Sequence, residues 1–303
     1  MIPIDNIKRR VRKEWQYHIM LLPAVVFILL FSYFPLYGVI IAFQKYNPTT
    51  SFSSTWIGFQ NFATVFLLPG FTRAVVNTMF ISFMKIVAGI VFPVMFALLL
   101  NEISIMWLKR SIQTLIYLPH FISWIILGGV FKEILSTDGG IVNTVLSRVG
   151  IRPVFFLGEK GVFPYTLLFT HVWKEFGYGT IVYLAALTNI DPGLYEAGMI
   201  DGAGRWRLTW HITLPGILSI ITLMTVLSIG SVMNAGFDQV FNLYNTAVYE
   251  TGDIIDTFVY RMGIEQAQYS TASAVGLFKS GVTAVLMILS YYLADRAAGY
   301  RVF

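Results

Sequence analysis

The chain has 303 residues, of which 56% are hydrophobic and only 12% charged, and its formal net charge is +5 at pH 7. A soluble domain carries about 25% charged and 45–50% apolar residues, so this composition is typical of a polytopic membrane protein. The chain contains no cysteine, which excludes thiol catalysis, disulfide bonds and cysteine-ligated metal. Its basic residues cluster beside apolar runs, where they set membrane orientation, so we expect no nucleic-acid partner.

A basic N-terminal tail at residues 1–17 precedes the first apolar run, at 18–43. A secretory signal has an apolar core of about 7–15 residues and a small-residue cleavage site, and this run is far longer. We therefore predict a first transmembrane helix at 18–43. The next segment, 44–73, is polar, aromatic and rich in turn residues, and we predict a loop there.

Five more apolar runs follow. Each is long enough for a helix of about 20 residues to cross a hydrocarbon core of about 30 Å, and a helix satisfies its own backbone hydrogen bonds in lipid. The sequence therefore predicts an all-α polytopic membrane protein with six transmembrane helices, the last five forming a core at 74–294. The five runs are 74–100, 111–131, 163–187, 214–235 and 271–294.

The density of basic residues predicts the orientation. One set of tails and loops holds eleven Lys and Arg, whereas the much longer loops of the opposite set hold seven. Because cytoplasmic segments carry the excess of basic residues, we place both termini and the first set in the cytoplasm. The first set is 1–17, 101–110, 189–213 and 295–303, and the second is 44–73, 132–162 and 236–270.

No catalytic or metal-binding motif is recognisable. A phosphate-binding P-loop needs a second glycine before its lysine, and the nearest segment, 276–280, lacks it. The segment 201–204 is not a dinucleotide fingerprint, because Arg207 replaces the third glycine. The histidines at 18, 120, 171 and 211 lie on different segments. We therefore expect no catalytic residue, no metal and no cofactor bound by this chain.

The stretch 189–215 is a polar, glycine-bearing island between two apolar runs. Asp191 before Pro192 is typical of a helix N-cap followed by proline at the first helical position. Gly202 and Gly204 are suited to ending such a helix. A helix of about ten residues is not stable alone in water, so it must pack on its own membrane domain or on a partner. A plain interfacial loop remains the alternative.

A spaced set of acidic, small and apolar residues lies in this stretch: Glu196, Ala197, Gly198, Asp201, Gly202, Ala203, Ile212, Leu214 and Pro215. The set resembles the cytoplasmic EAA loop of binding-protein-dependent ABC importer permeases, with Gly198 in place of the second alanine. The resemblance covers nearly the whole chain. Residues 37–48 in particular resemble the polysaccharide and oligosaccharide branch of the carbohydrate-uptake, maltose-permease-like class.

The resemblance implies a division of labour. A helix at 192–206 would couple this permease to a separate dimer of ATP-binding subunits, which would hold ATP and Mg and perform the hydrolysis. The other implied partners are a second permease subunit in a heterodimer, an extracytoplasmic solute-binding protein, the lipid bilayer and a sugar, most simply an oligosaccharide. The implied location is the bacterial inner membrane, and the implied mechanism is alternating access.

Polar residues inside the fourth and fifth apolar runs are candidates for the substrate path. They are Lys174, Glu175, Phe176, Tyr178, Ser228, Ser231, Asn234 and Asp238. Charges inside a span face a cavity or each other, and spacings of three and four place the second group on one helical face. The resemblance to maltose permease implies that these two regions line the sugar path.

Purely structural roles for the same residues remain alternatives. Lys174 and Glu175 can form a structural ion pair, and the hydroxyl and amide groups can hold helices together. Lys85 and Lys279 are expected to extend toward the membrane surface. For the whole chain, the alternatives are a self-sufficient ion-coupled secondary transporter and a structural or signalling subunit without a translocation path.

Overall fold

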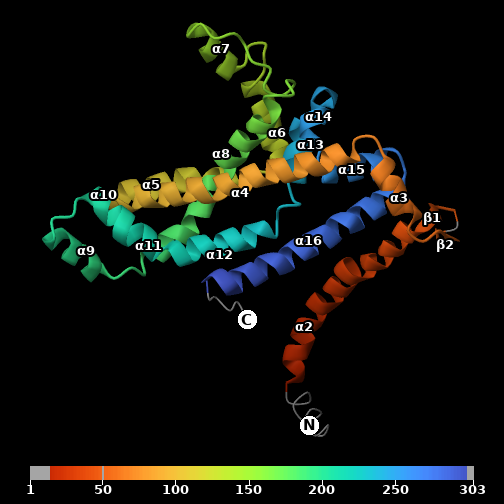
Figure 1. Ribbon diagram of the computed structural model, residues 1–303, viewed down its shortest axis with the longest axis horizontal. Coiled ribbons are helices and arrows are strands. Elements are labelled where there is room, and N and C mark those ends of the chain that lie inside the picture. The colour runs from red at the N-terminus through yellow and green to blue at the C-terminus, as the bar shows by residue number, and fades with distance from the viewer. Residues whose placement is uncertain (1–13, 50, 299–303) are drawn as a thin grey trace.

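The computed structural model describes residues 14–49 and 51–298, and helices dominate this part of the chain (Figure 1). The predicted tails at 1–17 and 295–303 lie largely outside the described residues. Among the described residues, Trp15–Phe43, Phe71–Asn101 and Tyr269–Tyr292 are long and apolar enough to cross a membrane. Two bent helix pairs raise the number of candidate spans to as many as five.

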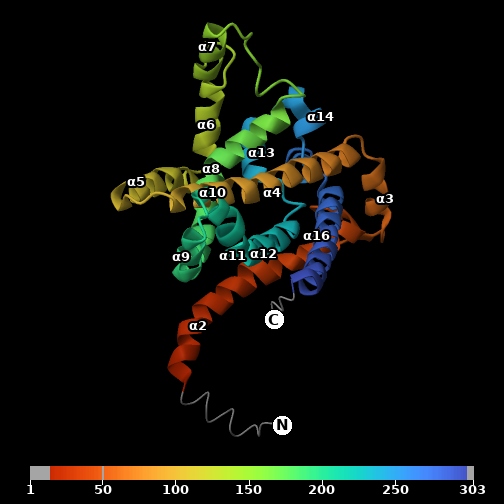
Figure 2. The same cartoon turned by 60° about the vertical axis from the view of Figure 1, so that its left-hand side comes forward.

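The first span consists of α2 (Trp15–Ile28), a π-helical turn (Leu29–Tyr33) and a 3-10 segment (Phe34–Phe43). Pro35 stands at the start of the 3-10 segment, where its missing N–H favours a departure from α geometry. No residue of α2 is buried, and the helix leads away from the rest of the molecule (Figures 1 and 2). This helix therefore presents its whole apolar surface outward.

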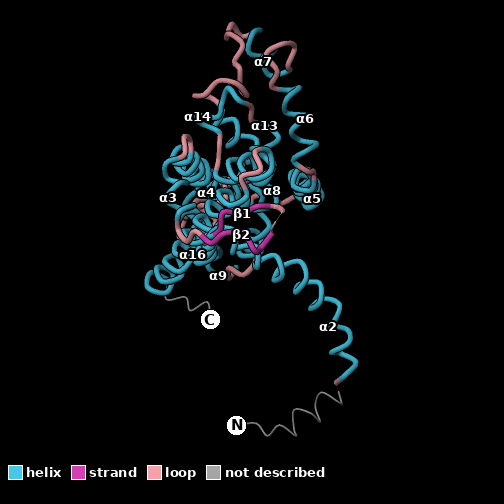
Figure 3. The backbone as a smooth tube through the Cα atoms, turned by 90° about the vertical axis from the view of Figure 1, so that its right-hand side faces the viewer, coloured by secondary structure: helices cyan, strands magenta, loops and turns pink. Residues whose placement is uncertain are grey.

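A short β-hairpin follows, within the segment 44–73 where the sequence predicts a loop. Strands β1 (Gln44–Asn47) and β2 (Ser51–Trp56) pair antiparallel, with Gln44 opposite Trp56 (Figure 3). Buried Asn61, in α3 (Gln60–Leu67), donates hydrogen bonds to the carbonyl oxygens of Ala42 and Gln44, each at 2.9 Å. These bonds fix the hairpin to the end of the first span.

The centre of the molecule is the pair α4 (Phe71–Asn101) and α8 (Phe163–Leu187), which pack along each other. Gly177 allows a second helix, α5 (Met106–Tyr117), to approach α8 closely, because a Cβ at Gly177 would lie 1.9 Å from the carbonyl oxygen of Ile116. A Cβ built at Gly179 would likewise lie 3.0 Å from Cγ of Pro93 in α4. The two glycines therefore set the distances between these three helices.

Two predicted spans are not continuous helices. The run at 111–131 divides into Met106–Phe121 and α6 (Trp124–Ile134), which meet at 102°. Pro119 lies in a 3-10 turn (Leu118–Phe121) at this break, and Ser123 caps α6 by accepting a hydrogen bond from the backbone of Ile126.

The run at 214–235 is also broken. Arg205–Gly216 and α12 (Leu218–Ile229) meet at 55°. The chain then turns before α13 (Phe237–Leu243), with Gly236 at φ +86°. The left-handed conformation at Gly236 suits glycine, because it has no Cβ to clash. A continuous helix through 235 is therefore excluded.

The segments between α6 and α8 and between α13 and α16 (Tyr269–Ala298) gather at one end of the bundle (Figure 2). They include the short helices α7 (Ile141–Arg148), α14 (Tyr249–Gly252) and α15 (Ile255–Tyr260), with turns at Thr246–Val248 and Arg261–Glu265. Glu250 bridges Lys160 at 2.6 Å and Arg73 at 3.8 Å. The hydrogen bond from Lys160, with its positive charge, holds the pKa of the Glu250 carboxyl below its usual range.

Candidate functional site

The first candidate site is the short helix α9 (Pro192–Ile200), which lies at the edge of the molecule beyond the helix core (Figure 1). Asp191 caps it, since its carboxylate accepts a hydrogen bond from the backbone of Gly193 at 2.9 Å. Pro192 fills the first helical position, where no backbone donor is needed. The start of the helix is therefore the one that the sequence predicts.

The end of α9 is a Schellman motif. The backbone of Gly202 donates to the carbonyl of Met199 at 3.1 Å, and that of Ala203 donates to the carbonyl of Gly198 at 2.9 Å. Gly202 has φ +76°, a left-handed conformation that is unfavourable for residues with a side chain. The predicted glycine of the motif thus ends the helix, and it ends it at Ile200.

The predicted helix at 192–206 is therefore two helices. Residues 201–204 separate α9 from α10 (Arg205–Leu208), which continues into a π turn (Thr209–Thr213) and α11 (Leu214–Gly216). The left-handed Gly202 is the physical reason for the break, because it cannot continue a right-handed helix. The two segments fold back on each other as a hairpin of helices.

One face of α9 packs against α10 and the π turn that follows it. A Cβ built at Gly198 would lie 2.7 Å from Leu208 Cδ2 and 3.3 Å from Ile212 Cδ1, so only a small residue fits without movement. The Tyr195 hydroxyl donates to Thr213 Oγ1 at 3.1 Å. Gly198 and Ile212, both predicted site residues, are therefore brought together.

The other face of α9 is uncovered. Glu196 and Ala197 are exposed, and Leu194 and Ile200 are 52% and 85% exposed. Ile200 is a large apolar residue at the tip of the helix, with no covering element among the described residues. This surface combines a carboxylate with apolar side chains on a helix that its own chain holds from one side only.

The π turn and α11 connect α9 to the helix core. Leu214 packs against a buried cluster that includes Tyr183 of α8 and Ile217. A Cβ built at Gly216 would lie 2.7 Å from Ile190 Cδ1, so the two ends of the 189–215 stretch touch. The 189–215 stretch therefore contacts the helix core beside both α8 and α12.

The second candidate site is a cluster of polar side chains on α8 at the break between α5 and α6. Lys174 is 7% exposed, and its ammonium donates to the His120 carbonyl at 2.5 Å and lies 3.2 Å from Glu175 Oε1. Glu175 Oε2 lies 2.7 Å from His120 Nδ1. The Lys174–Glu175 pair that the sequence left as an alternative is thus present, and Lys174 also binds a carbonyl at the helix break.

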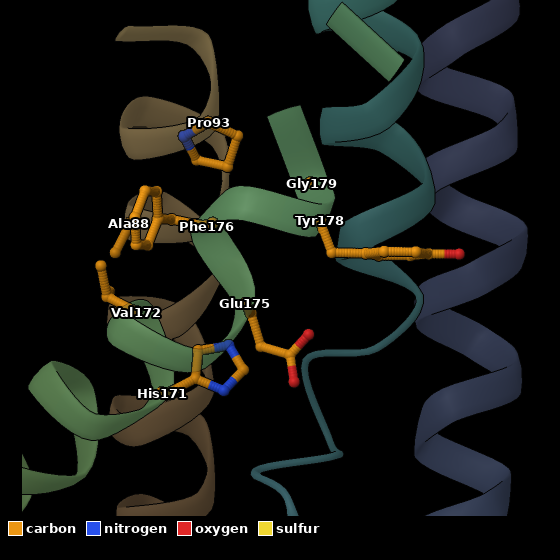
Figure 4. Close-up of a pocket in the computed structure, with 9 residues that line it drawn as sticks. Ala88, Pro93, His171, Val172, Glu175, Phe176, Tyr178 and Gly179 are labelled. Atoms are coloured by element: carbon orange, nitrogen blue, oxygen red, sulfur yellow. The ribbon is translucent and has the colours of Figure 1, made fainter. Parts of the chain in front are cut away.

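Tyr178 extends the cluster by stacking on the His120 ring, with centroids 3.8 Å apart and planes inclined by 3°. A pocket of about 250 Å³ lies along this part of α8 and is lined by His171, Glu175 and Tyr178 among others. Phe176 also lines this pocket, and its ring points toward Ala88 and away from Tyr178 (Figure 4). It packs on Phe96, with ring centroids 4.4 Å apart.

The predicted residues after α9 do not share one helical face. Ser228 lies in α12, but Ser231 and Asn234 lie in the turn that follows, and Asp238 lies in α13. Ser231, Asn234 and Asp238 are exposed, and the hydrogen bonds of Ser228 and Ser231 are to their own helix end. The predicted single face is wrong because α12 ends at Ile229.

Three polar residues, one partly buried and two buried, were missed or misjudged. His120 completes the cluster on α8, and the adjacent Pro119 was the available signal of a helix break. Lys85 does not extend to the surface; it is buried and donates to the Ala235 carbonyl at 2.6 Å and to Gln239. Gln239 in turn donates to Leu167 and Thr170 of α8, each at 2.7 Å.

Lys279 likewise pairs with Asp256 instead of reaching the surface. No group of three or more His, Asp or Glu side chains suited to a metal ion occurs in the described residues. The two sites are therefore an exposed helix face and a mainly apolar pocket that also carries His171, Glu175 and Tyr178.

A helical membrane core with broken spans, a pocket between α4 and α8 that carries polar groups, and a short helix exposed beyond the bundle are typical of a membrane transport component. Residues 89–299 match the family described as binding-protein-dependent transport system inner membrane component, and the chain belongs to this family. The predicted recognition as an importer permease is confirmed. The alternative of a self-sufficient ion-coupled transporter is wrong, because this family works with a separate binding protein.

Two relatives come from Bacillus subtilis (strain 168). The chain is 41% identical to Protein LplB over 286 residues, covering 94% of this chain and 90% of that protein. It is 40% identical to the polygalacturonan/rhamnogalacturonan transport system permease protein YteP over 280 residues, covering 92% and 87%. The predicted likeness to sugar permeases is thereby confirmed.

The fold matches a solved structure of a bacterial ABC transporter involved in the import of the acidic polysaccharide alginate. The TM-score is 0.88 at 36% identity, over 97% of this chain and 99% of the other. A second structure of the alginate transporter, in complex with a periplasmic protein that holds an alginate pentasaccharide, matches with a TM-score of 0.86 at 36% identity over 95% and 96%. The helical membrane fold is thereby confirmed.

Proposed function

We propose that this chain is the permease subunit of an ATP-driven oligosaccharide importer and that α9 couples it to a separate ATP-hydrolysing subunit. The observation that carries this proposal is the two-sided character of α9. The face that carries Tyr195 and Gly198 packs on the chain's own helices. The face that carries Glu196 and Ile200 is exposed. A helix held on one side only is suited to transmit the movement of a partner.

The partner surface fits a groove with an apolar floor and a donor for Glu196. Leu194, Ala197 and Ile200 follow one another at intervals of three residues, so they form one apolar stripe. An amphipathic helix that lays such a stripe into a groove is a common mode of recognition. We assign the groove to each member of a dimer of ATP-binding subunits, which hold ATP and Mg.

The proposed transmission runs from α9 through Ile212 and Leu214 into the core. Closure of the ATP-binding dimer would displace α9, and the packing of Leu214 beside Tyr183 and Ile217 would pass that displacement to α8 and α12. Both helices adjoin the pocket at the break of α5 and α6. Alternating access of this pocket, with both termini and α9 in the cytoplasm, follows from such a movement.

The proposed cargo is an oligosaccharide that contains uronic acids. Two relatives support this class, because polygalacturonan and alginate are both acidic polysaccharides. In the pocket, the face of Tyr178 can cover the apolar side of a sugar ring and Glu175 can accept hydrogen bonds from its hydroxyls. Asn234 and Asp238 lie outside the pocket lining and offer hydrogen bonds from the turn and from α13. Lys174 is already paired and buried, so we assign it to positioning His120 and not to the sugar carboxylate.

Two further partners complete the proposal. The outer loops at 132–162 and 236–270, which form one end of the bundle, would receive the solute-binding protein. The exposed α2 would lie against lipid and a second, similar permease subunit. The periplasmic-protein complex of the alginate transporter supports the first assignment by analogy.

Co-purification tests the coupling assignment. Glu196→Lys reverses the charge on the free face of α9, and we expect it to release the ATP-binding subunit and abolish ATP-dependent uptake of trigalacturonate in proteoliposomes. Glu102→Lys is the matched control, because Glu102 is also exposed but lies outside α9. Retention of the ATP-binding subunit by Glu196→Lys, or uptake that ignores ATP and responds to an ionophore, would contradict the proposal.

A further inference from the structure

A second groove lies between α15, its following π turn and α16, beside the start of α13. Its volume is about 550 Å³, against about 250 Å³ for the pocket beside Glu175. Ligand pockets measure about 300–1,000 Å³, so the groove has room for a small ligand. The lining residues used below are Phe237, Asp256, Tyr260, Tyr269, Ser273 and Gly276.

Aromatic rings form one part of the wall. Phe237 and Tyr260 lie 5.7 Å apart, and Tyr260 continues to Phe241 at 4.8 Å. The hydroxyls of Tyr260 and Tyr269 make no hydrogen bond with the described residues. Flat rings beside free hydroxyls suit a pyranose, whose C–H face packs on aromatics and whose hydroxyls exchange hydrogen bonds.

Small residues of α16 form another part of the groove wall. Gly276 lies on α16, and a Cβ built on it would meet no atom within 4 Å, so this glycine opens onto free space. Ser273 lies one turn earlier on the same helix and also lines the groove. The width of the groove therefore depends on the absence of a side chain at Gly276.

Asp256 supplies an unused hydrogen-bond acceptor. One carboxylate oxygen pairs with Lys279, while Oδ2 is buried and has no hydrogen-bond partner among the described residues. A buried polar atom without a partner costs about 1–3 kcal/mol. A donor from a ligand would remove this penalty after a small side-chain movement. Because Lys279 balances the charge, the wall favours a hydroxyl over a cation.

We propose that this groove is an outer sugar subsite, which holds one ring of the incoming oligosaccharide before it reaches the pocket at α8. The inference rests on the proposed function, because it takes the cargo to be an oligosaccharide. Phe237 follows directly on the turn that carries Asn234, so the groove borders this turn. The aromatic wall and the Asp256 acceptor bind ring faces and hydroxyls, and the uronic carboxylates stay outside.

Cysteine protection tests occupancy directly, because the chain has no cysteine of its own. Ser273→Cys places one thiol in the groove, and Thr64→Cys places one on an exposed position of α3, outside the groove lining. Both variants are labelled with a membrane-impermeant methanethiosulfonate in the assembled complex. Trigalacturonate at ten times its Kd should slow labelling of Ser273→Cys about 10-fold and leave Thr64→Cys unchanged.

Equal labelling of Ser273→Cys with and without trigalacturonate would overturn the subsite. Slow labelling in proteoliposomes without sugar, together with fast labelling in detergent, would also overturn it, since lipid would then fill the groove. Uptake of trigalacturonate by the wild-type complex tests the proposed function separately. The two failures are therefore distinguishable, because protection is read without transport.

Filling the groove gives a second test. Gly276→Leu places a side chain in the open space, whereas Gly281→Leu makes the same change where a Cβ also meets nothing within 4 Å but outside the groove. Both changes replace a helical glycine, so both improve helix propensity equally. Gly276→Leu should lower uptake of trigalacturonate at least 10-fold relative to Gly281→Leu. Equal uptake by the two variants would contradict the subsite.

Discussion

Substitution of Gly202 by alanine should increase the fraction of α9 that is locally unfolded, without removing any side-chain contact of the helix. Gly202 ends the helix at φ +76°, and its substitution meets no neighbouring atom, so the effect is confined to the backbone. The left-handed conformation costs a residue with a Cβ about 1–2 kcal/mol. Since α9 is too short to be stable by itself, this penalty falls directly on its opening equilibrium. A penalty of this size corresponds to about a 5- to 30-fold change in population.

Hydrogen exchange of the α9 amides measures that population. We expect the amides of Met199 to Ala203 to exchange about 5- to 30-fold faster in Gly202→Ala than in the wild type, as the free-energy change requires. Gly202→Asn should be intermediate, because asparagine tolerates the left-handed region. Gly204→Ala is the control, since Gly204 has φ −74° and open space around it. Unchanged exchange in Gly202→Ala, or an equal effect of Gly204→Ala, would refute the capping argument.

Three further outcomes are expected. Lys85→Met leaves two buried acceptors without a donor, at a cost of about 1–3 kcal/mol, and should lower the unfolding temperature, whereas exposed Lys45→Met should not. Tyr178→Ala should reduce sugar uptake with assembly intact, and equal loss in Tyr165→Ala, an exposed position on the same helix, would argue against a substrate role. The pKa of Glu250 is lowered in the folded chain, so its ion pair stabilises the fold at pH values above the ordinary carboxyl pKa of 4.5. This stabilisation is lost as pH falls through the lowered pKa. Acid should therefore speed exchange of the α14 amides, after correction for intrinsic rates, and Glu250→Gln should remove this dependence.

The start and end of α9 could be predicted because both depend on local chemistry. The Asp191–Pro192 pair and Gly202 act within a few residues of themselves, and the structure uses each of them as the sequence indicates. The break at 201–204 was indicated by Gly202 and Gly204, whereas the family resemblance implied one helix over 192–206. The return of Arg205–Leu208 onto α9 could not be predicted, because it depends on the packing of Leu208 against Gly198, which sequence spacing does not reveal.

The broken spans could not be predicted from hydropathy. Apolar residues continue through both breaks, so hydropathy indicates the length of the apolar run but not whether one continuous helix spans it. Pro119 and Pro215 were local signals of the two breaks. The turn after α12 had no such signal, because it is held by the Lys85 bond to the carbonyl of Ala235, across 150 positions. The β-hairpin was missed for a different reason, since its buried support, Asn61, lies beyond the hairpin itself.

The bond between Lys85 and the carbonyl of Ala235 also bears on how the chain is made. During synthesis α4 emerges first and must enter the membrane with a charged lysine whose acceptors are still untranslated. Translocon-based scales put a lysine at the centre of a span at about 2.5–3.5 kcal/mol. Lys174 faces no such delay, because its acceptor at His120 precedes it in the chain. Nascent chains that stop before Ala235 should therefore hold α4 less firmly in the bilayer than chains that extend past Gln239, and α13 acts as the late-arriving partner that completes its insertion.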